Sequence, residues 1–121
     1  MIEITISQML QMVPILKQLT EKSFDGVITF KIVKLIKKIE KELDSFNVAY
    51  EKIVDKYKTK KNIVDENLRQ IQDEKIDIFN KELEELLNLK IKLNIEKIPE
   101  EVFESIKITP NQAFLIQDII E

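Results

Sequence analysis

The sequence predicts a mainly α-helical fold with a small β-sheet, an α+β protein with a single domain over residues 1–121. The stretch from Val27 to Tyr57 contains no Gly and no Pro, and its apolar residues recur with helical spacing. With one Gly and three Pro among 121 residues, the chain has too few turn-forming residues for an all-β fold. A strictly alternating segment at 89–95 indicates a strand. We therefore expect a long helix paired with a shorter antiparallel helix, flanked by short strands and terminal helices.

The long helix predicted at 27–57 keeps its apolar residues in one heptad phase, with alternating steps of four and three. Two heptad positions carry them: Ile32, Ile39, Phe46 and Ile53 on one, and Ile36, Leu43, Tyr50 and Tyr57 on the other. This pattern is typical of a coiled coil that is buried along one narrow seam. At the usual rise the helix would be about 45 Å long. Shorter helices of the same chain can cover the seam in a helical hairpin, which we favour, or a second copy can cover it in a homodimer.

The chain before this helix predicts a strand, a helix and a turn. Residues 2–6 alternate apolar and polar side chains, and Ser7 can cap the helix that follows. That helix carries an apolar face of Met9, Met12, Val13, Leu16 and Leu19. Pro14 falls inside it and removes one backbone hydrogen bond, so we expect either a kink or two shorter helices. The segment 21–26 contains Ser, Asp and the single Gly, which predicts a turn.

Beyond the long helix, residues 62–72 fit either a helical extension or an irregular excursion. A second helix is predicted from Asp73, a plausible cap, to about Asn88. Its apolar face consists of Ile76, Phe79, Leu83, Leu86 and Leu87. Folded back antiparallel, this helix would cover the C-terminal half of the long seam, and the N-terminal helix would cover the rest.

The last third of the chain predicts two strands and two helices. Residues 89–95 form the clearest strand, and a helical turn begins after Pro99. Residues 106–108 predict a further short strand, and Thr109 and Pro110 predict the start of a helix that continues almost to the terminus. Both ends of the chain thus show a strand, a hydroxyl cap and a helix. We expect both end strands to lie beside the strand at 89–95.

The composition provides little chemistry for catalysis. The chain contains no His and no Cys, which removes the commonest general base, the commonest zinc ligand and every thiolate. Its single Gly excludes a glycine-rich phosphate loop. The clustered carboxylates are Glu82, Glu84, Glu85, Glu96, Glu100 and Glu101. Without nucleophilic partners these groups indicate solvated helix faces. We therefore expect no enzyme activity, no cofactor and no metal.

A candidate interaction surface lies on the long helix. Its first half carries a lysine stripe of Lys31, Lys34, Lys37, Lys38 and Lys41. Farther along, Asp44, Glu51 and Asp55 replace the lysines, so the helix has a basic half and a more acidic half. We add Tyr50 and Tyr57 to the candidate surface because Tyr is enriched at interfaces, although we favour core packing with the hydroxyl at the edge for both.

The charge and the termini set expectations about partners. A net charge of −3 from 19 basic and 22 acidic residues indicates no general affinity for nucleic acid or membranes. The lysine stripe could still bind nucleic acid, but it contains no Arg and no interleaved aromatic residue, so we favour a protein partner. No apolar run approaches about 18 residues and the N-terminus lacks a signal peptide, so we expect a cytoplasmic protein without a membrane partner.

The order of these elements resembles a known family. Five features carry the resemblance: Ile4–Leu10 (Ile-Thr-Ile-Ser-Gln-Met-Leu), the Lys- and Glu-rich helix at 27–57, the segment Phe79–Leu87, the strand at 89–95, and Ile-Thr-Pro at 108–110. Together they resemble short phage and prophage proteins of Gram-positive bacteria that are catalogued as a domain of unknown function. The resemblance implies a phage origin and synthesis in the host cytoplasm, with possible incorporation into the virion. It supplies no catalytic residues.

From these points we expect a non-enzymatic phage accessory protein that acts by binding another protein, as a virion assembly factor or as an inhibitor of a host defence protein. The alternative is a nucleic-acid-binding accessory factor that uses the lysine stripe.

Overall fold

The computed structural model describes residues 2–58 and 75–121. In chain order its elements are β1 (Ile2–Thr5), α1 (Ile6–Thr20), α2 (Gly26–Tyr57), α3 (Ile76–Leu87), β2 (Lys90–Leu93), α4 (Glu100–Phe103), α5 (Pro110–Ile116) and the 3-10 helix η3 (Gln117–Ile119). The predicted fold class, mainly α with a small β-sheet, is therefore confirmed. The predictions for residues 62–72 and for a cap at Asp73 lie outside the described residues.

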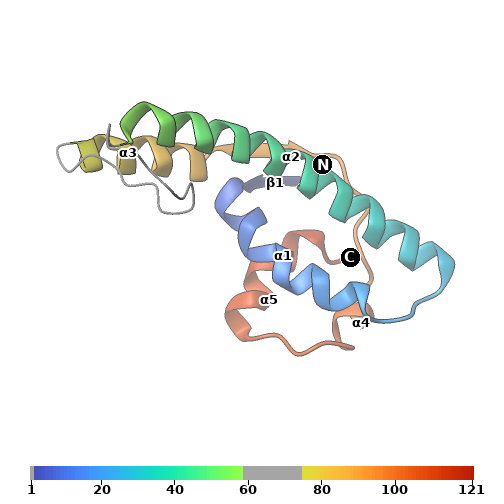
Figure 1. Cartoon of the computed structure of the whole chain (residues 1–121). Helices are drawn as coiled ribbons and strands as arrows, with labels where there is room; N and C mark the ends of the chain where they lie inside the picture. The colour runs from blue at the N-terminus through green and yellow to red at the C-terminus, as the bar shows by residue number, and fades with distance from the viewer. Residues whose placement is uncertain (1, 59–74) are drawn as a thin grey trace.

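The long helix α2 spans the molecule, and shorter helices cover its two halves (Figure 1). Helix α1 packs against the N-terminal half, and α3 runs antiparallel beside the C-terminal half. Helix α5 contacts α1 on the side away from α2, so α1 lies between two helices. The intrachain hairpin with an additional bracing helix is thus the arrangement that forms.

The buried face of α2 follows the predicted seam with two changes. Its buried residues are Ile32, Leu35, Ile39, Phe46, Val54 and Tyr57. Four of them belong to the predicted heptad positions, whereas Leu35 and Val54 do not. A helix of 3.6 residues per turn drifts by about 20° per heptad, so Val54 replaces Ile53 as the buried residue near the C-terminal end. Helices α1 and α3 pack against this seam within the chain, and its residues Ile36, Leu43 and Tyr50 remain partly exposed.

Helix α1 forms the centre of the core. Its six buried residues, each no more than 3% exposed, are Ile6, Met9, Met12, Ile15, Leu16 and Leu19. The helix is continuous from Ile6 to Thr20 even though Pro14 lies inside it, and Pro14 itself is exposed. The alternative of two shorter helices is therefore wrong. The surrounding helices and the sheet hold α1 together despite its missing hydrogen bond.

The cap of α1 is Thr5, so the prediction of Ser7 was wrong. The Thr5 hydroxyl accepts a hydrogen bond from the Gln8 backbone at 3.1 Å, and the Gln8 side chain accepts one from the Thr5 backbone at 2.8 Å. This capping box satisfies the backbone N–H groups of Thr5 and Gln8 at the start of the helix. The earlier start also places Ile6 in the core, where it is 3% exposed.

Of the two end strands that the sequence predicts, only the N-terminal one lies in the sheet. Strand β1 pairs antiparallel with β2, with Ile2 opposite Leu93 and Thr5 opposite Lys90. The predictions of a strand at 106–108 and of its pairing with β2 were wrong. Those residues follow the turn after α4, and their two isoleucines pack against the core instead. The prediction failed because alternation marks residues that face a core but does not specify a backbone partner.

The C-terminal segment pairs with the chain after β2 at a single residue. The Ile98 backbone donates to Ile119 at 2.8 Å, and its carbonyl accepts from the Glu121 backbone at 2.8 Å. Thr109 and Gln112 form the predicted capping box of α5, and Pro110 occupies its first turn. The last helix ends at Ile116 and continues as the 3-10 helix η3, earlier than the sequence predicts.

Candidate functional site

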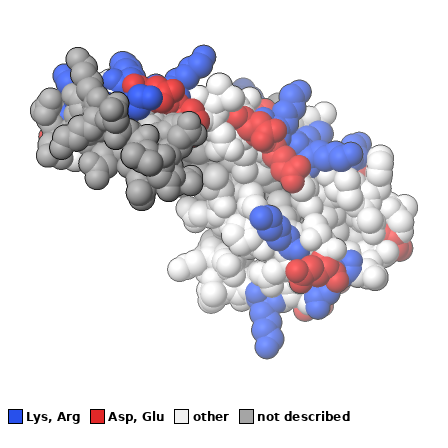
Figure 2. Space-filling model, viewed as in Figure 1, with Lys and Arg blue, Asp and Glu red and all other residues white. Residues whose placement is uncertain are grey.

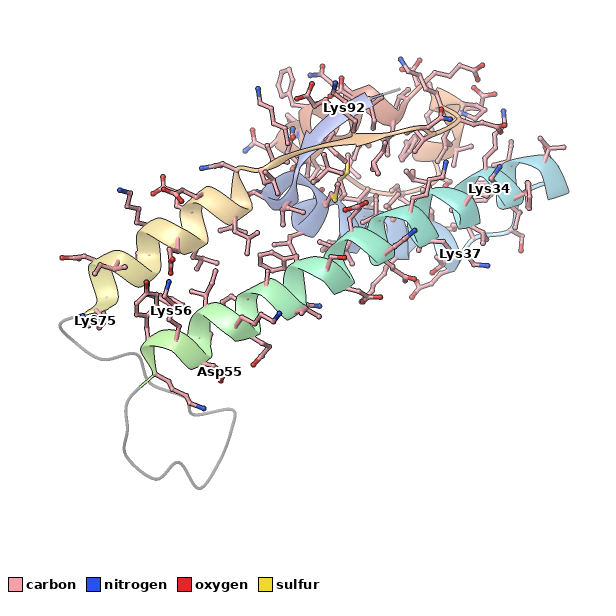
Figure 3. All side chains as sticks on the ribbon, turned by 90° about the horizontal axis from the view of Figure 1, so that it is seen from above. Lys34, Lys37, Asp55, Lys56, Lys75 and Lys92 are labelled. Atoms are coloured by element: carbon pink, nitrogen blue, oxygen red, sulfur yellow. The ribbon has the colours of Figure 1, made fainter. Side chains whose placement is uncertain are left out.

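The lysine stripe divides into two parts on the folded helix. Lys31, Lys34 and Lys38 line a pocket of about 160 Å³ between α2 and residues 94–96. Lys37 and Lys41 are exposed and do not line it. In Figure 3, Lys34 extends from α2 towards the chain after β2, whereas Lys37 extends away from that chain. The stripe therefore serves two different faces.

The pocket combines cationic and apolar groups. Leu35 and Ile95 contribute apolar surface, and Glu96 is its one acidic residue. The Lys38 ammonium donates a hydrogen bond to the Asn94 carbonyl and so connects α2 to this segment. With three ammonium groups and one carboxylate, the pocket is electropositive. Because an apolar cavity of about 150 Å³ can hold benzene, a pocket of about 160 Å³ has room for one side chain of a partner.

Two exposed apolar residues lie in the first turns of α2, next to the pocket lysines. Val27 is 67% exposed and Phe30 is 62% exposed. The Lys34 ammonium lies 5.2 Å from the centre of the Phe30 ring, a cation–π contact between positions four residues apart. Sequence reasoning missed both residues as site candidates. The sequence did indicate that both residues are exposed, because neither lies on the heptad seam that predicts the buried face.

Tyr50 and Tyr57 lie away from the lysines, in the packing between α2 and α3. Tyr50 is half-buried, and its ring centre is 6.0 Å from that of Phe46 and 6.4 Å from that of Phe79. Tyr57 is 9% exposed and packs in a small cluster with Val54 and Phe79. The structure therefore does not bring the two tyrosines into one surface with the lysine stripe.

An ion pair holds α3 against α2 at this end of the hairpin. The Lys56 Nζ atom lies 3.0 Å from Glu82 Oε1 and 5.0 Å from the centre of the Tyr57 ring. The Lys56 ammonium, and after it the Tyr57 hydroxyl, lowers the pKa of Glu82 below its ordinary value. The Glu82 carboxylate in turn raises the pKa of Lys56. Both shifts favour the charged forms, so the pair is ionised at neutral pH.

We expect the contribution of this pair to folding stability to depend on pH in acid. A lowered Glu82 pKa means that its carboxylate stabilises the fold above about pH 4.3, and that this effect is lost as the pH falls through the folded-state pKa. The raised pKa of Lys56 removes the effect only in alkali, above about pH 10. Glu82→Gln should therefore be less stable than the wild type at pH 7, and the difference should shrink by pH 3 in urea unfolding.

The matched control is Glu85→Gln, an exposed residue of the same helix for which no such ion pair is described. Its stability difference from the wild type should be small at both pH values. A Glu82→Gln difference that is the same at pH 7 and at pH 3 would contradict the assignment.

Among residues 2–58 and 75–121, no group of three or more acidic side chains could hold a metal ion. Within the same residues, no helix is long and apolar enough to cross a membrane.

Comparison with known proteins identifies no relative. No family model, no curated protein and no solved structure matches this chain.

Proposed function

We propose that this chain is a non-enzymatic accessory protein that acts by binding another protein, and that it binds through the N-terminal half of α2. The observation that carries the proposal is the exposure of Val27 and Phe30, 67% and 62%, beside an electropositive pocket. We name these residues, together with Lys31, Lys34 and Lys38, the docking face. A large exposed aromatic residue bordered by cations is a common anchor for a protein partner.

The chemistry of the docking face defines its partner. An acidic side chain can extend its carboxylate towards the three ammonium groups while its methylene groups contact Leu35 and Ile95. An apolar side chain beside it can cover Val27 and Phe30, which makes the burial of those residues favourable. The expected partner therefore presents an acidic residue next to an apolar one. Such charge complementarity mainly raises the association rate and the specificity.

The resemblance to short phage proteins supports the biological part of the proposal. On that resemblance we propose a partner in the virion, for a role in assembly, or a host defence protein, for a role in its inhibition. Synthesis in the host cytoplasm is compatible with both roles.

A second candidate function is binding of single-stranded nucleic acid. It is favoured by Phe30, since an exposed ring beside lysines is the combination on which bases stack. It is disfavoured by Glu96 in the pocket and by the absence of Arg from the docking face. We therefore rank it below protein binding.

The test captures partners from a lysate of phage-infected Gram-positive cells with the immobilised protein. We expect an acidic protein to be retained by the wild type and lost with the double variant Lys31→Glu/Lys38→Glu. With the purified partner, this variant should weaken the affinity at least about tenfold, because two attractions become repulsions. Phe30→Ala should weaken it by a similar factor through the loss of an apolar anchor.

The matched control is Lys81→Glu/Lys107→Glu, which makes the same charge change at exposed positions outside the docking face. It should bind as the wild type does. If the docking-face variants retain the same protein as the wild type, the proposal is wrong. Tight binding of a labelled single-stranded oligonucleotide at low salt, with loss of affinity as salt rises, would favour the second candidate.

A further inference from the structure

A second stripe of residues with heptad spacing runs along the outer side of α2, opposite the seam. Its members, all exposed, are Lys34, Lys37, Lys41, Asp44, Val48 and Glu51. We name this stripe the outer ridge. Successive members are separated by alternating steps of three and four residues, so they stay on one side of the helix. Asp55 continues the stripe, and Figure 3 shows it on the same side of α2 as Lys37, away from α3.

The charges on the outer ridge change sign at its middle. The first three members are lysines, whereas two of the last three are acidic. Figure 2 shows that both signs of charge reach the surface along α2. Among the described residues, neither Lys41 nor Asp44 has an ion-pair partner. The outer ridge is thus complementary in charge to a second outer ridge that runs in the opposite direction.

We propose that the outer ridge binds a second copy of this chain, with the two α2 helices antiparallel. A two-fold axis between positions 42 and 43 places Lys41 opposite Asp44 of the second copy, and Lys34 opposite Glu51. Because the axis relates the copies, each contact occurs twice. Lys37 then lies opposite Val48, whose side chain is 59% exposed, and its aliphatic stem can cover that side chain.

The same charges argue against other ways of pairing the ridge. A parallel pair would place each lysine against its own copy and Asp44 against Asp44, so every charged contact would be repulsive. A shift of one heptad in one direction places Lys37 opposite Lys41. A shift in the other direction keeps opposite charges at Lys37–Asp55 and Lys41–Glu51 but adds a repulsive contact between Lys34 and Lys58. One antiparallel register is therefore favoured, and exposed ion pairs make it a weak and salt-sensitive association.

This inference goes beyond the proposed function because it concerns a different partner and another face of α2. The two faces adjoin at Phe30 and Lys34, whereas Lys31 and Lys38 border the pocket and Lys41 and Asp44 do not.

The test measures the mass of the full chain by sedimentation equilibrium, from about 10 μM to about 500 μM, at low and at high salt. The wild-type mass should rise from monomer towards dimer with concentration, and high salt should shift it back. Lys41→Asp and Asp44→Lys should each weaken self-association about tenfold or more, because each creates two like-charge contacts. An equimolar mixture of the two variants should form a dimer again, because both contacts between positions 41 and 44 then join an acidic and a basic side chain.

Lys81→Asp, a charge change on α3, is the matched control and should dimerise as the wild type does. A wild type that remains monomeric over the whole range would overturn the inference, and so would a dimer that is insensitive to both ridge variants. The absence of dimer in the mixture would overturn the antiparallel register. None of these results affects the proposed function, because its docking-face variants leave Lys41 and Asp44 unchanged.

Discussion

Replacing Leu19 by Ala should lower the free energy of unfolding by about 3 kcal/mol, within the usual range of about 2–5 kcal/mol for a buried leucine. Leu19 is 1% exposed and belongs to the main core cluster with the other buried residues of α1. Because α1 lies between α2 and α5, its neighbours cannot all move in to fill the vacated space. For a chain of this length the melting temperature should fall by roughly 4 °C per kcal/mol, which thermal unfolding followed by circular dichroism measures.

Leu10→Ala is the matched control because it makes the same change on the same helix. Leu10 is 39% exposed, so the substitution removes less buried surface, and alanine also favours the helix. We expect a loss of less than about 1 kcal/mol. Equal losses at the two positions would contradict the placement of α1 at the centre of the core.

Replacing Pro14 by Ala should stabilise the protein, by about 2 kcal/mol. Proline in a helix interior is about 3 kcal/mol less favourable than alanine, partly because it lacks the amide hydrogen. In α1 the new amide can donate to the Leu10 carbonyl, four residues earlier in a continuous helix. Pro14 is exposed, so alanine there leaves no cavity. Greater freedom of the unfolded chain offsets about 0.4–1 kcal/mol of the gain.

Pro110→Ala tests whether the gain depends on the position in the helix. Pro110 lies in the first turn of α5, where the missing amide hydrogen has no helical partner in any case. This variant should be neutral or slightly less stable than the wild type. Urea unfolding of the two variants side by side measures both effects. A loss of stability for Pro14→Ala would show that α1 needs the proline for its packing.

The contrast between the two predicted end strands shows what hydrophobic alternation can and cannot predict. Residues 2–5 and 106–108 have the same alternation, and only the first segment became a strand. A strand needs a backbone partner as well as an apolar face. Strand β2 provides one for β1, whereas the C-terminal end pairs with Ile98 through Ile119 and Glu121. The choice between these partners depends on contacts between residues distant in the chain.

The candidate site was predictable only in part, because it also depends on contacts between residues that are distant in the chain. The lysine stripe could be listed from spacing alone, and its position on α2 follows from helical geometry. Its division into pocket lysines and ridge lysines depends on residues 94–96, which lie more than 50 positions away along the chain. The placement of Tyr50 and Tyr57 against Phe79 likewise required the position of α3.

The long helix, its buried seam and the capping box of α5 could all be read from the sequence, because they depend on neighbours within about four residues. The pairing of α2 with shorter helices of the same chain was also predictable. The central position of α1 in the core, in place of α2, became evident only from the packing of the helices. Helix α1 is covered on several sides, and a helix buried in this way shows a weak periodicity that gives little indication of its neighbours. The long helix, with one side buried and the other exposed, shows its seam in the sequence and carries both surfaces that we propose for binding.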